Sequence, residues 1–79
     1  MNPVSIEFML TQPGDEQVYI YEITGRLVYS RELKYNSTGL KTVKWDGKEN
    51  NGLITESGVY IVKVSAKNAS STKKFIRQN

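Results

Sequence analysis

In residues 4–10, apolar side chains occupy every second position, and mostly polar side chains stand between them. A period of two is typical of a strand that buries one face. A similar alternation runs through residues 59–66, the longest stretch rich in strand-forming residues. No stretch of the sequence repeats with the period of 3.6 that an amphipathic helix requires. The pattern therefore predicts an all-β chain.

Turn-forming residues divide the chain about every 8–12 residues, a spacing typical of antiparallel sandwiches and barrels. We expect about six or seven short strands, at residues 4–10, 17–23, 27–33, 40–45, 59–66 and 71–77, with residues 53–55 as the candidate for a very short seventh. Between them, Gly25 is expected to take a positive φ in a tight link. Residues 46–52 are expected to form a loop, and residues 67–70 a hairpin-like link. With no internal repeat and no linker, residues 1–79 are predicted to form one small antiparallel β-sandwich.

Aromatic residues on the predicted strands allow two interpretations. Trp45 shares a face with Val43, which favours a buried core anchor. The other interpretation is a platform for stacking sugar rings, for which four tyrosines are candidates: Tyr19, Tyr21, Tyr29 and Tyr35. Tyrosine is also a good strand former, so the sequence leaves sugar binding open.

Composition narrows the chemistry. The 79 residues include no cysteine and no histidine. Histidine is the usual general base and the commonest transition-metal ligand, so Ser-His-Asp triads, cysteine nucleophiles and zinc sites are excluded. We therefore expect a binding, targeting or structural module that is not an enzyme and carries no cofactor or metal. No segment approaches the length of an apolar transmembrane helix, and no secretory signal peptide opens the sequence.

Charge is distributed unevenly along the chain. Residues 1–32 carry five acids and two bases, whereas residues 33–79 carry nine bases and three acids. The last predicted strand is basic through Lys73, Lys74 and Arg77. Such a strand can attract an anionic partner, or it can simply discourage edge-to-edge aggregation. Without a phosphate-binding glycine loop, a recognition helix or an RNA-binding aromatic motif, we expect no nucleic-acid partner.

The loop at residues 46–52 gathers oxygen-bearing side chains, which calcium prefers as ligands. Its spacing does not match an EF-hand, because Lys48 stands at a position where that loop has a ligand. A plain turn, in which Asp and Asn side chains accept hydrogen bonds from their own backbone, is the favoured prediction.

Several segments together resemble one known family. Asn2-Pro3 stands near the start, as in the family's front marker. The other similar segments are residues 18–28 (v-x-I-Y-D-x-x-G-R-x-V), 39–47 (G-x-x-x-V-x-W-D-G), 50–60 (N-x-G … S-G-V-Y) and 72–76 (T-K-K-hydrophobic). This order is similar to that of the C-terminal sorting domain of type IX secretion substrates, a relative of the immunoglobulin-like domain of flagellar hook-capping proteins. Two departures are Glu22 in place of Asp and Met1 in place of the first proline of the marker.

The resemblance implies an immunoglobulin-like β-sandwich of about seven strands at the C-terminus of a larger secreted protein. It implies delivery through the periplasm to the cell surface, with the outer-membrane secretion machinery, a sortase-like peptidase and the N-terminal cargo domain of the same chain as partners. By this resemblance, the residues expected to contact the translocon are Gly58, Tyr60, Lys73, Lys74, Phe75, Ile76 and Arg77.

Other functions remain open at this point. The domain could be a structural or carbohydrate-binding immunoglobulin-like accessory domain of an extracellular enzyme or a flagellar protein. The last strand is expected to lie at a sheet edge, where a partner strand can be added. A weak dimer could form through the same edge.

Overall fold

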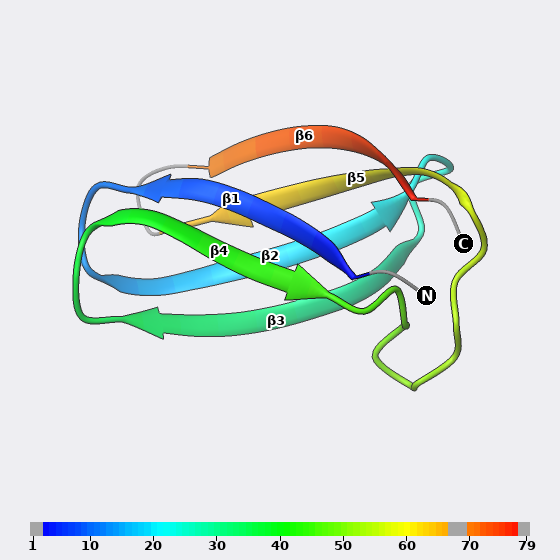
Figure 1. Ribbon diagram of the computed structural model, residues 1–79, viewed down its shortest axis with the longest axis horizontal. Coiled ribbons are helices and arrows are strands. Elements are labelled where there is room, and N and C mark those ends of the chain that lie inside the picture. Colours follow the sequence, from blue (N-terminus) through cyan, green and yellow to red (C-terminus); the bar gives the residue numbers. More distant parts are fainter. Residues whose placement is uncertain (1–2, 67–69, 78–79) are drawn as a thin grey trace.

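The computed structural model describes residues 3–66 and 70–77, which form six antiparallel strands (Figure 1). The strands are β1 (Val4–Leu10), β2 (Gly14–Glu22), β3 (Leu27–Tyr35), β4 (Gly39–Trp45), β5 (Gly58–Ser65) and β6 (Ser70–Arg77). They build a two-stranded sheet, β1–β4, and a four-stranded sheet in the order β3–β2–β5–β6. The smaller sheet lies across one face of the larger one, so the predicted immunoglobulin-like β-sandwich is confirmed. The described residues contain no helix long and apolar enough to cross a membrane.

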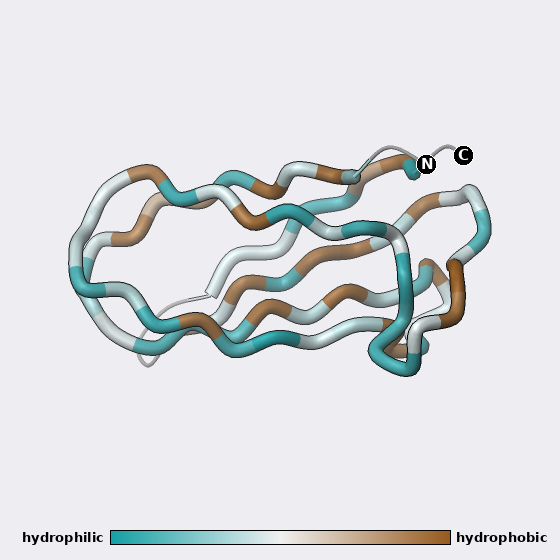
Figure 2. Tube along the Cα trace, turned by 60° about the horizontal axis from the view of Figure 1, so that its bottom comes forward, coloured by the Kyte–Doolittle hydropathy of each residue, from teal (hydrophilic) through white to brown (hydrophobic). Residues whose placement is uncertain are grey.

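The core lies between the two sheets, where alternate residues of each strand point inward. Val18 and Ile20 of β2 have no exposed surface, and Trp45 at the end of β4 is almost completely buried. Figure 2 shows the resulting alternation of apolar and polar positions along the strands. The other buried apolar residues are Ile6, Phe8, Leu10, Val28, Val43, Tyr60, Val62 and Val64. Ile6, Phe8 and Leu10 of β1 are thus buried and Val4 is partly buried against the core, as the alternation in the sequence predicts.

Six strands form in the described residues, the lower of the two predicted counts, because residues 53–55 do not form the very short seventh strand. A single bridge joins Lys48 to Ile54 within the loop that connects β4 to β5. Leu53 and Ile54 are both more than 60% exposed, so this short apolar stretch has no neighbouring sheet against which to pack. Most of the predicted link at residues 67–70 lies outside the described residues.

Two strands are longer than predicted. β2 begins at Gly14, and β3 continues to Tyr35, which is its partner across the ladder. The predicted turn residues before Gln17 are therefore partly strand, and the turn itself shrinks to residues 11–13. Gly25 has a φ of 99° in the link between β2 and β3, as predicted. A register shift near Ile20 forms a bulge there, which lets Val28 as well as Tyr29 pack against the core.

Candidate interaction surface

An aromatic cluster joins the ends of β4, β5 and β6. The Trp45 ring lies 5.5 Å from that of Tyr60 and 6.0 Å from that of Phe75, both in edge-to-face geometry. Tyr60 and Phe75 are paired across the β5–β6 ladder, and their rings stack at 6.0 Å. The two polar tips are satisfied by loop carbonyls: Trp45 Nε1 donates to Lys48 at 2.9 Å, and the Tyr60 hydroxyl donates to Glu56 at 2.6 Å. The cluster therefore ties the last strand to the loop at residues 46–57.

Arg77, the last residue of β6, extends this connection into the interior. Its side chain is 1% exposed, and its Nη1 donates to the carbonyl oxygen of Thr55 at 2.7 Å. Its guanidinium lies 5.9 Å from the centre of the Trp45 ring, within the range of a cation–π contact. A buried charge is costly unless it is well partnered, so these contacts give Arg77 a structural role, in which the end of β6 holds the loop at Thr55.

Gly47 leaves the space that Arg77 occupies. A Cβ at this position would overlap the Arg77 guanidinium, and the backbone φ of 82° already favours glycine. The Gly47 carbonyl accepts hydrogen bonds from both Thr55 Oγ1 at 2.6 Å and Thr55 N at 2.9 Å. Two residues of the Trp45-Asp46-Gly47 segment thus pack against the side chain of Arg77: the ring of Trp45 and the backbone of Gly47.

Polar contacts hold the other side of the loop. Asn50 Oδ1 accepts from the Ser30 amide at 2.7 Å, and Asn50 Nδ2 donates to the Ser30 carbonyl at 3.0 Å, which docks the loop on β3. Arg26 donates to both Glu22 and Glu49, with shortest distances of 3.0 and 3.1 Å. The hydrogen bonds from Arg26 lower the pKa of the Glu22 carboxyl below its ordinary value of 4.5, and these carboxylates raise the pKa of Arg26.

The loop oxygens behave as turn formers. Asp46 Oδ1 accepts from the Lys48 amide at 3.0 Å, and Asn51 Oδ1 accepts from the Leu53 amide at 3.0 Å. Both are the local side-chain-to-backbone bonds that the sequence predicts for a plain turn. Among the described residues, no group of three or more acidic side chains is arranged to hold a metal ion.

The structure divides the seven residues expected to contact a translocon. Tyr60 and Arg77 are buried in the interior, and Gly58 and Phe75 are partly buried. Only three present exposed side chains: Lys73, Lys74 and Ile76. Their alternation along β6 directs Lys73 to the inner side of the sheet and Lys74 and Ile76 to its outer face. Partner contact by the set stays a prediction, but burial limits direct contact to these three.

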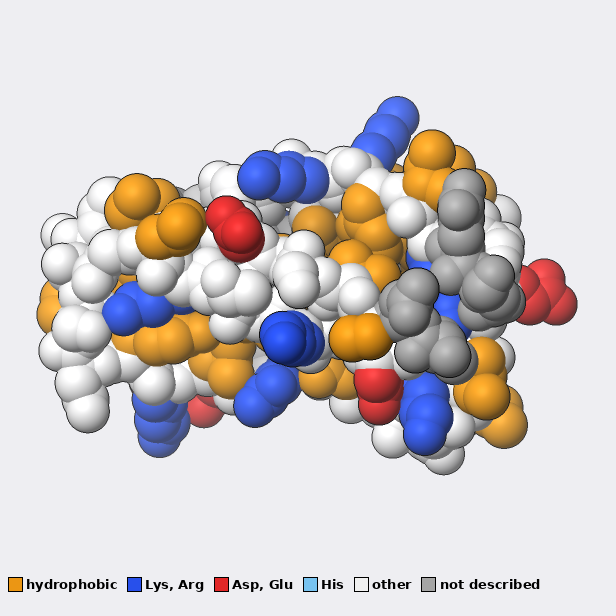
Figure 3. All heavy atoms as spheres, viewed as in Figure 1, with side chains coloured by type: hydrophobic (Ala, Val, Ile, Leu, Met, Phe, Trp, Pro, Cys, Tyr) orange, Lys and Arg blue, Asp and Glu red, His pale blue; other side chains and the backbone are white. Residues whose placement is uncertain are grey.

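β6 lies at the edge of the four-stranded sheet, as the sequence predicts for the last strand. Ile76 is 69% exposed and faces outward beside Val59, its partner on β5. Figure 3 shows basic side chains projecting from the upper rim of the molecule, where β6 lies. β6 therefore offers unpaired backbone groups, positive charge and apolar surface at one edge.

The four candidate tyrosines do not form one platform. Tyr19 and Tyr21 lie on the outer face of β2, with ring centres 6.4 Å apart and planes inclined by 33°. Tyr29 packs on the inner side against Trp45, and Tyr35 packs against Phe8. Any stacking of sugar on exposed rings would be limited to the two tyrosines of β2.

The role of Arg77 is not evident from the sequence. A basic residue at the end of a basic strand looks like one more exposed charge, yet Arg77 points inward because strand alternation places it on the same side as Phe75. The available signal was the glycine at position 47 directly after Trp45 and Asp46, which marks a close approach of another group to the backbone.

Comparison with known proteins agrees with this architecture. The family model described as FlgD Ig-like domain matches residues 1–70. No curated protein and no solved structure gave a significant match. The family match covers all strands except most of β6, and it accords with the all-β sandwich and with the resemblance to hook-capping proteins. The chain belongs to the FlgD Ig-like domain family.

Proposed function

We propose that this domain is a non-catalytic immunoglobulin-like accessory module of a secreted or flagellar protein that acts through protein–protein contact. Its membership of the FlgD Ig-like family supports an accessory role. Polar groups of loop 46–57 make hydrogen bonds within the domain. Asn50 binds Ser30 of β3, and the Thr55 carbonyl accepts from Arg77 of β6. Such an arrangement favours a module recognised through its surface over one that performs chemistry.

Within this class, we propose that the domain serves as a sorting module read by a type IX outer-membrane translocon. One observation carries this proposal: β6 is an edge strand whose outer side presents Lys74 and the 69% exposed Ile76. An exposed edge permits pairing with a partner strand, and its positive charge guides docking on an acidic surface. The resemblance of the motifs to secretion substrates supports the same role.

The buried members of the predicted set have an indirect role in this proposal. Tyr60 and Arg77 hold β6 in place through the aromatic cluster and Thr55, so their loss would disturb recognition by displacing the strand. They are positioning residues, and Lys74 and Ile76 make the contact. Removing residues 75–79 would therefore test the fold and the contact together, because Arg77 goes with the tail.

A sharper test uses a reporter in a host that has type IX secretion. Residues 1–79 are fused after a periplasmic reporter, and surface delivery is measured by protease accessibility on whole cells. The test variant combines Lys74→Glu with Ile76→Thr, both on the exposed outer side of β6. Lys34→Glu is the matched control, because Lys34 is an exposed lysine on β3, the opposite edge strand of the same sheet.

We expect the intact fusion and the Lys34 variant to reach the surface, and the β6 variant to remain in the periplasm while folded. If all three are delivered equally, the outer side of β6 is not the contact. If the intact fusion stays in the periplasm with a folded domain, the sorting role is excluded. The accessory role would then be left, to be tested by capture of the parent protein's neighbours through cross-linking at Ile76.

A further inference from the structure

The smaller sheet has an unfilled edge. β1 and β4 are its only strands among the described residues, and they cover a sheet of four. β1 pairs with β4 along its whole length, so alternate N–H and C=O groups of β1 point away from the sheet without a strand to receive them. The inner side of β6 is correspondingly less covered than that of β5, because Lys73 is exposed there while its neighbour Val62 is buried.

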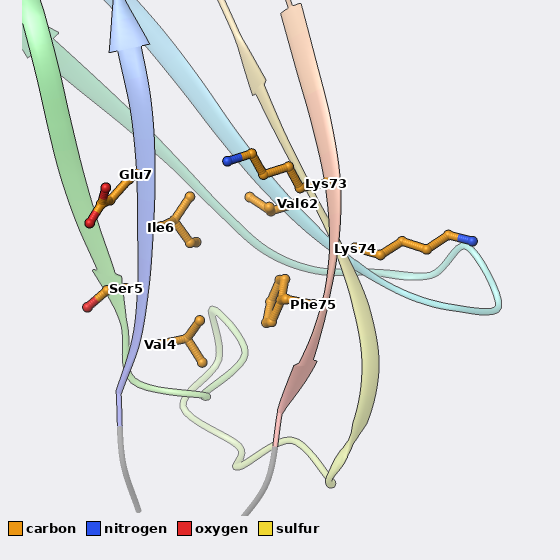
Figure 4. Close-up of a pocket in the computed structure, with 8 residues that line it drawn as sticks. All are labelled: Val4, Ser5, Ile6, Glu7, Val62, Lys73, Lys74 and Phe75. Carbon is orange, nitrogen blue, oxygen red and sulfur yellow. The ribbon is translucent and has the colours of Figure 1, made fainter.

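An open groove follows this edge. It has a volume of about 290 Å³ and runs between consecutive residues of β1, 4–7, and of β6, 73–75. Figure 4 shows Val4, Ile6 and Phe75 pointing into the groove, whereas Glu7 points away from it. Compact ligand pockets have volumes of about 300–1,000 Å³, so this groove is at the lower limit for a small molecule. An extended peptide needs less space, because it inserts only every second side chain.

Lys73 gives the groove its charge. In Figure 4 its side chain extends across the groove from β6 toward β1. Within the described part of the chain, the ion pairs formed are those of Arg26 with Glu22 and Glu49, so Lys73 has no carboxylate partner. The side chains that point into the groove beside it are apolar, those of Val4, Ile6 and Phe75, whereas the lining residues Glu7 and Lys74 point away. A carboxylate flanked by two apolar side chains is the complementary pattern for this surface.

We propose that the free edge of β1 binds an extended segment of a partner protein, which adds a third strand to the smaller sheet. Side chains of the segment that face inward follow the pattern apolar–acidic–apolar, with the acid at Lys73 and an apolar residue beside Phe75. The added strand pairs with β1 through main-chain hydrogen bonds, the mode known as β-augmentation. This inference does not depend on the export role, which rests on the outer side of β6.

A second copy of the domain is a poorer occupant of the same edge. Figure 1 shows that β6 extends beyond β1 at this side of the sandwich, so the larger sheet overhangs the free edge. A second domain that approached β1 with its own edge would meet β6 before its strand could pair. A single extended segment has no second sheet and fits beneath the overhang.

The test is a titration of the isotope-labelled 79-residue chain with the peptide Thr-Val-Thr-Glu-Thr-Val-Thr, blocked at both ends, followed by amide hydrogen exchange. We expect slower exchange at alternate amides of β1, those that point away from β4, and unchanged exchange at the amides already bonded to β4. A peptide with lysine in place of its glutamate is the charge control.

Charge reversal at two adjacent positions sharpens the test. Lys73→Glu should change the ratio of affinities for the acidic and basic peptides by about tenfold in favour of the basic one. Lys74→Glu carries the same change of charge but faces outward, so the ratio should stay within about twofold, given screening by salt. Equal effects of the two variants would reveal unspecific electrostatic attraction and overturn the proposal.

Two further results would also overturn it. One is the absence of slowed exchange in β1 at millimolar peptide. The other is slowing that increases with protein concentration in the absence of peptide, which would assign the edge to a second copy.

Discussion

The two ends of β6 contact very different surroundings. At its C-terminal end, Arg77 and Phe75 are enclosed by Trp45, Thr55 and Gly47, and we call this region the closed end. Along its earlier part, Lys73 faces the groove beside β1, and we call this region the open side. One strand thus contributes the buried guanidinium of Arg77 at one end and the solvent-exposed amine of Lys73 four residues earlier.

The difference shows how the family's motif residues are used. At the closed end, the Thr55 carbonyl, the Trp45 ring and Gly47 fit around the side chain of Arg77, so changes there act on the fold. At the open side, backbone groups of β1 and the amine of Lys73 are left outside, so changes there act on binding. The motif residues therefore fall in both regions: Trp45, Gly47 and Tyr60 are buried and specify the fold, whereas Lys73 and Lys74 remain exposed for the contacts proposed above.

The largest expected effect is the loss of Arg77 at the closed end. Arg77→Ala leaves the Thr55 carbonyl without its donor and opens a cavity beside Trp45, so we expect a loss of about 3 kcal/mol in the free energy of unfolding. A domain of this size has about 4–12 kcal/mol in total. Urea denaturation followed by Trp45 fluorescence measures the loss.

Lys73→Ala provides the comparison on the open side. Because its amine is exposed and has no ion pair among the described residues, the change should alter stability by no more than about 0.5 kcal/mol. If Arg77→Ala and Lys73→Ala lower the free energy of unfolding by the same amount, the distinction between closed end and open side is wrong.

The second prediction concerns the fit of Gly47 around Arg77. Gly47→Ala should cost about 2–3 kcal/mol, since the added Cβ overlaps the guanidinium and the φ of 82° is strained for alanine. In the Arg77→Ala background only the backbone strain is left, so the cost should fall to about 1 kcal/mol. The coupling is measured by a double-mutant cycle in urea, and additive costs would show that the two positions do not touch.

Strand alternation accounts for the part of the fold that the sequence predicts well. In β1, polar or exposed residues separate residues of the core, and in β5 the residues between Tyr60, Val62 and Val64 are only partly buried, so burial follows a period of two. The failure at residues 53–55 has the opposite cause. Two adjacent apolar residues suggest a strand locally, but a strand also needs a neighbouring sheet, and the chain supplies none at that point.

The candidate site was harder to predict than the fold. The sequence identifies β6 as basic and at an edge, but it cannot separate Arg77 from Lys73, because the burial of Arg77 depends on Gly47 and Thr55 some 20 to 30 positions earlier. Likewise, the free edge of β1 follows from which strands pair, and strand order is not encoded in local periodicity.

A smaller effect is expected at the hydroxyl of Tyr60. Tyr60→Phe keeps the ring packed against Trp45 and Phe75 but removes the hydrogen bond to the Glu56 carbonyl. We expect a loss of about 1 kcal/mol in the free energy of unfolding, typical of a single neutral hydrogen bond. Differential scanning calorimetry provides the measurement. A tyrosine that is not part of the closed end, Tyr19→Phe on β2, is the control and should show no change.

The smallest expected effect is electrostatic. Arg26 lowers the pKa of Glu22, so Arg26→Gln should return that pKa toward 4.5 in a carbon-detected NMR titration of the side-chain carboxyl. Lys44→Gln, at an exposed lysine of β4, is the control and should leave the pKa low. An unchanged pKa in the Arg26 variant would show that Arg26 is not the cause.

The sign of the stability effect follows from the same shift. Because the pKa of Glu22 is lower in the folded chain than in the unfolded chain, its carboxylate stabilises the fold above pH 4.5, and this contribution is lost as the pH falls through the folded pKa. Burial raises the pKa of Glu16, so Glu16 acts in the opposite direction. The contribution of Glu16 is the same in the parent chain and in the Arg26→Gln variant, so it cancels in the difference between their unfolding free energies. The difference in unfolding free energy between the parent chain and the Arg26 variant should therefore shrink on acidification, and urea midpoints measured through that pH range would test whether it does.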